Sequence, residues 1–121
     1  MHAVAQNHSF NRAADEIGMT ADEVASLVAY IAENPMAGKA IAGTGGCRKV
    51  RVAARGKGKS GGYRTMTFYT GDKMPVFLLT VFAKGEKVDL TKAECNALRK
   101  ITKAIVEAYN TRVVSVSKKG A

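Results

Sequence analysis

Seven lysine and arginine side chains lie within seventeen consecutive residues near the middle of the chain, and no acid lies among them: Arg48, Lys49, Arg51, Arg55, Lys57, Lys59 and Arg64. Clustered guanidinium and ammonium groups attract polyanions and donate hydrogen bonds to phosphate oxygens. They also stabilise the extra negative charge that a phosphodiester acquires while it is being cleaved. RNA carries its own nucleophile in the 2′-hydroxyl. The cluster therefore predicts RNA binding and is compatible with RNA cleavage.

The charge of the whole chain is unevenly distributed. Nineteen lysines and arginines against ten acids give a formal net charge of +9, and no acid occurs between Glu33 and Asp72, where eight bases lie. Such a field attracts nucleic acid, an anionic membrane or an acidic protein. The alternative is a solvated face that only maintains solubility, although such faces usually mix both signs. No apolar run reaches the roughly 18 residues of a membrane span and no secretory signal is evident, so a cytoplasmic protein without a membrane partner is expected.

Conventional catalytic and metal-binding sets are missing from the sequence. His2 and His8 lie in the N-terminal segment, away from the basic cluster, and no acid pair or Ser-His-Asp set is evident. Cys47 and Cys95 are 48 residues apart with no CxxC motif, so neither a zinc site nor a redox pair is supported, and no cofactor is expected. An enzyme built on this chain would rely on lysine, arginine, tyrosine and Glu86, and would need a larger partner to align its substrate.

The glycine-rich stretch inside the basic cluster imitates two nucleotide-binding motifs. Gly56 to Gly61 fits GxGxxG, and Gly58-Lys59-Ser60 resembles the end of a P-loop. Both motifs must open a helix that holds phosphate at its N-terminus, whereas the residues that follow alternate as a strand does, and Ala53 stands where the first P-loop glycine belongs. The motifs are therefore rejected. The glycines are expected to form a flexible turn whose Lys57 and Lys59 contact phosphates.

Length and apolar spacing predict one domain, residues 1–121, that begins with two short helices. Apolar residues at helical spacing predict a helix from Phe10 to Ile17, ended by Gly18. The capping box Thr20-Ala-Asp-Glu23 predicts a second helix, which stops at Asn34-Pro35 because the residue before a proline is pushed out of helical geometry.

A sheet is predicted after a glycine-rich connector at 36–46. Its strands are expected at 47–54, 63–70 and 76–83, with a hairpin turn at 56–62. The first strand alternates, so Val50 and Val52 face the core while Lys49 and Arg51 share the exposed face. The third is apolar on both faces, as is typical of a central strand covered by helices.

The two ends of the chain complete the expected fold. Residues 2–6 are compatible with a short edge strand. Thr91-Lys-Ala-Glu94 is a second capping box, which predicts a third helix whose apolar face holds Leu98, Ile101, Ile105 and Ala108. The tail at 110–121 either adds an edge strand over 112–116 or frays.

Three segments together resemble a known family. They are Gly43–Val52 (GTGGCRKVRV), Gly56–Arg64 (GKGKSGGYR) and Leu78–Lys84 (LLTVFAK), followed by Glu86 and Asp89-Leu90. In order and spacing these residues resemble the HigB branch of the RelE superfamily of bacterial toxins, from about position 43 to position 101. The first forty residues match only in the number and placement of their helices.

The resemblance implies a fold and a function. The fold is α+β and RelE-like, with a small antiparallel sheet, two N-terminal helices and one C-terminal helix. The function is that of a toxin in a type II toxin–antitoxin system: a ribosome-dependent endoribonuclease, or mRNA interferase, that cleaves mRNA in the A site of the 70S ribosome and inhibits translation. The implied partners are mRNA, the ribosome and a cognate antitoxin, often one with a helix-turn-helix domain.

The resemblance also assigns roles to individual residues. Lys49 and Arg51 match the paired bases of the family's first long strand, Arg64 matches the arginine of its Gly-Tyr-Arg sequence, and Lys84 lies where a further base follows the central strand; these four are the expected catalytic cations. The residues expected to bind RNA are Arg48, Arg55, Lys57, Lys59 and Tyr63. The tyrosine of the RelE members has no counterpart, because the matching position is near Leu90. The candidates for base stacking or proton transfer are Tyr63, Tyr69 and Glu86.

Two other functional classes stay open. ParE toxins share the scaffold but inhibit DNA gyrase without catalysis, so toxicity with DNA damage and intact mRNA would favour that class. A plain RNA- or DNA-binding module needs only the basic surface, and would show steep salt dependence with neither toxicity nor cleavage.

Overall fold

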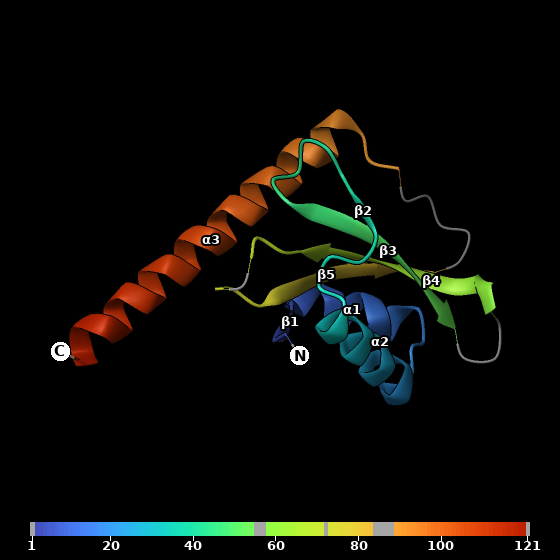
Figure 1. Ribbon diagram of the computed structural model, residues 1–121. Coiled ribbons are helices and arrows are strands. Elements are labelled where there is room, and N and C mark those ends of the chain that lie inside the picture. The colour runs from blue at the N-terminus through green and yellow to red at the C-terminus, as the bar shows by residue number, and fades with distance from the viewer. Residues whose placement is uncertain (1, 55–57, 72, 84–88, 121) are drawn as a thin grey trace.

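The computed structural model describes residues 2–120 except 55–57, 72 and 84–88, and it describes only the backbone at 53–54, 58–61 and 110–120. In these ranges a five-stranded sheet has two short helices on one face and one long helix on the other (Figure 1). The order of the strands across the sheet is β1-β5-β4-β3-β2. The predicted α+β class is confirmed.

The strands are β1 (Val4–Gln6), β2 (Lys39–Ala40), β3 (Cys47–Ala54), β4 (Gly58–Phe68) and β5 (Val76–Phe82). Three neighbouring pairs are antiparallel, but β1 runs parallel to β5, which differs from the expected all-antiparallel sheet. The reason is the connection: β1 and β5 are separated in the chain by α1, α2 and three strands, so no hairpin joins them and they can run parallel.

The N-terminal helices, α1 (His8–Glu16) and α2 (Ala21–Glu33), cover one face of the sheet (Figure 1). Both capping-box bonds of Thr20 and Glu23 are present at the start of α2, and Gly18 has the positive φ of +79° that lets the chain turn between the helices. Phe10 and Leu27 are fully buried with Val50 and Leu78. The predicted inward direction of the β3 valines is thus confirmed.

The C-terminal helix, α3 (Lys92–Gly120), lies on the opposite face and extends beyond the sheet (Figure 1). Its capping box, Thr91 with Glu94, is formed as predicted. Leu98, Ile105 and Val106 pack on the cluster made by Cys47, Met66, Phe68 and Leu79. None of the helices in the described ranges is long and apolar enough to cross a membrane.

Two residues of the predicted apolar face of α3, Ile101 and Ala108, are exposed instead of buried. Ile101 is 48% exposed, whereas Thr102 is 2% exposed and donates its hydroxyl to the backbone oxygen of Thr44, at 3.0 Å. Thr44 is itself fully buried, and its Oγ1 accepts from the amide of Cys47. The helix is rotated so that a polar side chain satisfies the buried carbonyl, since leaving that carbonyl unpaired would be costly.

Three predicted segments differ from the structure. The turn expected at Gly56–Gly62 is shorter, because β4 already begins at Gly58, which pairs with Ala54 past a bulge in β3. The connector at 36–46 contains β2, whose two residues are too few to show a period in the sequence. At the C-terminus the backbone of 110–120 continues α3, so neither an edge strand nor a frayed tail is formed there.

The contact between Thr102 and Thr44 gives a first prediction. Thr102→Val keeps the shape of the side chain but removes the donor, which leaves the Thr44 carbonyl buried and unpaired. We expect the free energy of unfolding in urea to fall by about 1–3 kcal/mol. The matched control is Ile101→Ala, one position away and exposed, which should change it by less than about 0.5 kcal/mol. Equal losses in the two variants would contradict this role for Thr102.

Candidate nucleic-acid interface

Strand pairing brings the main predicted cations to one face of the sheet. Arg51 in β3 lies directly opposite Arg64 in β4, and Lys49 lies opposite Met66. Directly opposed residues of antiparallel strands project from the same face, with Cβ atoms about 5 Å apart. Since Met66 belongs to the cluster under α3, the three cations lie on the α3 face. The structure thus brings Lys49, Arg51 and Arg64 together, as their expected common role requires.

A fourth cation on this face was missed by the sequence analysis. Lys39 in β2 lies directly opposite Lys49, so it belongs to the same face. The sequence pattern did not indicate a strand at Lys39, because β2 has only two residues and is flanked by glycine and alanine. The face therefore carries two like-charged cross-strand pairs, Lys39 with Lys49 and Arg51 with Arg64. We call these four side chains the cation face.

The cation face is not neutralised from within. Among the side chains that the structure describes, no carboxylate makes an ion pair with any of the four cations. Lys39 and Arg51 are exposed, and Lys49 and Arg64 are partly buried. Like charges placed directly opposite each other destabilise a sheet, and this cost persists unless an anion binds between them. The arrangement is that of a surface that accepts an external polyanion.

A cavity adjoins the lysine end of the cation face. It has a volume of about 390 Å³, and it lies between the β2 region and the residues that lead into α3. Lys39 and Lys49 line it together with the exposed carboxylate of Asp89. Its apolar wall is made by Ala40, Ile41, Ala42, Leu90 and Cys95. The face is thus hollowed where the lysines lie, and its walls offer both charge and apolar surface.

Two residues that were expected to bind RNA do not lie on the cation face. Arg48 alternates with Lys49 and therefore belongs to the α1–α2 side, where its guanidinium donates to the backbone oxygen of Gly38 at 3.0 Å. Tyr63 lies opposite Val52 and packs against the core under α2. The β-strand period placed Arg48 with Val50 from the beginning, but the position of Tyr63 depends on the pairing of β3 with β4.

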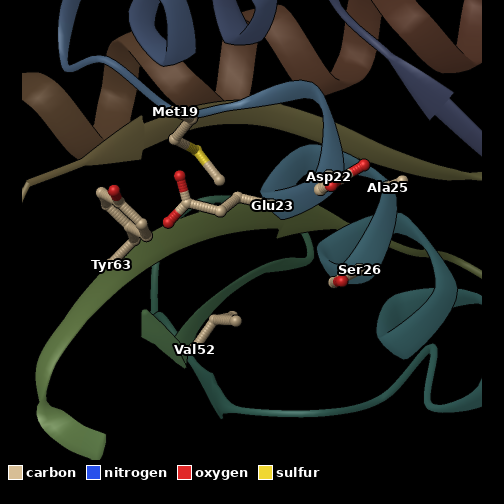
Figure 2. Close-up of a pocket in the computed structure, with 7 residues that line it drawn as sticks. All are labelled: Met19, Asp22, Glu23, Ala25, Ser26, Val52 and Tyr63. Atoms are coloured by element: carbon tan, nitrogen blue, oxygen red, sulfur yellow. The ribbon is translucent and has the colours of Figure 1, made fainter. Parts of the chain in front are cut away.

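Tyr63 takes part in a polar contact of its own. Figure 2 shows its hydroxyl pointing toward the carboxylate of Glu23, in a cavity of about 550 Å³ that is also lined by Met19, Asp22 and Ser26. Burial raises the pKa of the Tyr63 phenol, and the charge of Glu23 and the hydrogen bond to it raise the pKa further. The phenol is therefore held protonated as a donor to Glu23, on the side of the sheet away from the cations.

The other predicted residues divide into two groups. Tyr69 also lies on the α1–α2 side, where its ring meets the ring of His2 edge to face, with 5.0 Å between the ring centroids. Arg55, Lys57, Lys84 and Glu86 lie outside the described residues, and the side chain of Lys59 does as well. Neither candidate tyrosine is therefore placed to stack on a ligand at the cation face.

Fold and site together define a small basic α+β protein with a cationic sheet face, and the comparisons with known proteins give its family. Residues 2–121 match the family model described as RelE toxin of the RelE / RelB toxin–antitoxin system, so the chain belongs to the RelE toxin family. Among solved structures it is similar to a double mutant of the E. coli toxin RelE in the free state, with 18% identity and a TM-score of 0.50 over 69% of this chain and 84% of that one. This likeness agrees with the fold expected from the sequence. The protein is a toxin of a toxin–antitoxin system, whose partner is an antitoxin.

The like-charged pairs give a prediction about stability. Arg51→Gln removes the repulsion between Arg51 and Arg64, so at low salt we expect the free energy of unfolding to rise by about 0.2–1 kcal/mol. High salt should shrink the gain, because it screens exposed charges. The neighbouring Arg48→Gln is the matched control: it loses the hydrogen bond to the backbone oxygen of Gly38, so its free energy of unfolding should not rise. A loss of stability in Arg51→Gln at low salt would show that Arg51 has an internal partner.

Proposed function

We propose that the chain is a ribosome-dependent mRNA endonuclease that inhibits translation, acts in the cytoplasm and belongs to the HigB branch of its family. The observation that carries the proposal is the cation face, two like-charged pairs without an ion-pair partner among the described side chains. Membership in the RelE family supports it at the level of the family. The proposal extends the family assignment to a substrate, a reaction and a set of residues.

The reaction we propose is attack by the 2′-hydroxyl of a ribose on the adjacent phosphorus. The 2′-oxygen forms a bond to phosphorus, the bond from phosphorus to the 5′-oxygen of the next nucleotide breaks, and the proton of the hydroxyl leaves while the 5′-oxygen gains one. Negative charge grows on the phosphoryl oxygens as this happens. Arg64 and Lys84 stabilise that charge, because donors aimed at developing charge contribute most to catalysis.

Lys49 and Arg51 complete the proposed catalytic set by holding the mRNA backbone: Arg51 contacts the same phosphate as Arg64, and Lys49 contacts the neighbouring phosphate. Lys57 and Lys59, with Arg55, would contact further phosphates of mRNA or ribosomal RNA. Neither histidine lies near the cation face: His2 packs against Tyr69 and its ring is hydrogen-bonded to the backbone oxygen of Met74, and His8 begins α1 on the opposite face of the sheet. A site without a strong general base needs its substrate aligned, and we propose that the ribosome provides the alignment.

The antitoxin is proposed to act on the same charge. An acidic or helical segment placed near the cation face would neutralise the paired cations, and an antitoxin on a remote face would instead prevent docking to the ribosome. A helix-turn-helix domain in the antitoxin would let the complex bind its own operator. Binding data on Arg51→Gln and Arg64→Gln with the purified antitoxin would separate the two modes, since only the first depends on these arginines.

Expression of Arg64→Ala in bacteria tests the proposed activity. We expect the number of surviving cells to rise by at least about a hundredfold relative to the wild type, because loss of one charge-stabilising donor typically lowers the rate of cleavage by that much. Primer extension on mRNA after brief expression should show codon-associated cuts with the wild type and none with the variant. Arg12→Ala, an exposed arginine in α1, is the control and should remain toxic.

Three outcomes would count against the proposal. Full toxicity of Arg64→Ala contradicts the role of Arg64. Toxicity of the wild type with intact mRNA and a DNA-damage response would instead indicate a gyrase inhibitor of the ParE type. Binding to RNA without toxicity or cleavage would indicate a simple nucleic-acid-binding module.

A further inference from the structure

An aromatic side chain lies beside the cation face and has no role in the proposed chemistry. Phe82, the last residue of β5, lies directly opposite Arg64, so the two project from the same face with Cβ atoms about 5 Å apart. Phe82 packs partly on the cluster under α3, yet it is only partly buried. Tyr63 and Tyr69 lie on the other face. Among the described aromatic residues, Phe82 is the one paired directly with a cation of the face.

The cation face has a regular spacing. Lys49 and Arg51 are two positions apart in β3, so their Cα atoms lie about 6.6 Å apart along the strand. Each has a like-charged neighbour across the sheet, Lys39 for one and Arg64 for the other. Two doubly charged positions at this separation suit two successive phosphates of an extended single strand. Phe82 lies one strand beyond the second position.

We propose that Phe82 is a base-stacking platform for single-stranded RNA. One phosphate lies between Lys39 and Lys49, the next lies between Arg51 and Arg64, and the base beyond the second phosphate stacks on the exposed part of Phe82. The inference rests on the proposed function, since it requires RNA on the cation face. It supplies the stacking group that neither tyrosine is positioned to provide.

The chemistry of phenylalanine sets what this platform does. A phenyl ring has a π-face for any base but no hydrogen-bonding group, so it supports stacking and does not distinguish one base from another. Phe82 is thus a positioning residue. By fixing the nucleotide next to Arg64, it restricts the rotation of the ribose and holds the phosphodiester in register with the arginines.

Short RNA oligonucleotides that carry 2-aminopurine at one position provide the test, because the fluorescence of this base is quenched when it stacks. The proteins compared are the full-length wild type, Phe82→Leu and Phe77→Leu. Leucine keeps apolar packing but has no π-face. Phe77 is the matched control: it lies in the same strand and packs partly buried on the same cluster, at the end away from Arg64.

We expect one labelled position to be quenched by the wild type and by Phe77→Leu, and not by Phe82→Leu. Affinity for unlabelled RNA should fall about tenfold in Phe82→Leu, the loss expected for one stacked base. An abasic site at the quenched position should lower the RNA affinity of the wild type by a similar factor and leave the RNA affinity of Phe82→Leu unchanged. Equal quenching and equal affinity in Phe82→Leu and Phe77→Leu would overturn the inference, as would the absence of any RNA binding by the wild type.

These measurements contain no ribosome and no cleavage, so they separate the inference from the proposed function. Unchanged quenching in Phe82→Leu, together with codon-associated cuts that require Arg64, would reject the stacking role of Phe82 and support the endonuclease activity. Loss of quenching in Phe82→Leu, together with intact mRNA in cells, would support the stacking role of Phe82 and reject the endonuclease activity.

Discussion

Repulsion between like charges on neighbouring strands is the constraint around which this structure is arranged. Arg51 faces Arg64 and Lys39 faces Lys49, and none of the four makes an ion pair with a described carboxylate. A fold selected only for stability would not retain such pairs, because opposite charges or apolar residues at the same positions would stabilise the sheet. The unfavourable pairing becomes favourable when a polyanion binds, so the strain indicates a binding surface.

The rest of the fold keeps the strands in the register that creates these pairs. Buried side chains on the α1–α2 side, Val50 among them, pack β3 against the helices of that face. On the opposite face, α3 packs on the end of the sheet that carries Cys47 and Phe68. A slip of one residue would bury the cations and expose the valines, which makes the register strongly specified. Half of the ten acids lie in the N-terminal part of the chain, which forms the α1–α2 layer: residues 1–38 contain five acids and one arginine.

The sequence was sufficient for features that depend on local pattern, and insufficient for those that depend on pairing. The capping boxes of α2 and α3 and the alternation of β3 were predictable because each involves neighbouring residues. Lys39 was missed because its place on the cation face follows from the pairing of β2 with β3. Tyr63 lies on the face opposite the cations because it pairs with Val52 across β3 and β4, and this register cannot be read from local pattern. Thr102 replaced Ile101 in the interior because of a carbonyl 58 residues away in sequence.

Side-chain NMR during titration with a non-cleavable RNA oligonucleotide tests the central claim most directly, because it reports each cation separately. The account predicts that the signals of Lys39, Lys49, Arg51 and Arg64 shift together, while that of Arg48, which alternates with them in β3, stays in place. Shifts of Arg48 and of the Tyr63 ring, with the four cations unmoved, would place the ligand on the opposite layer and contradict the account.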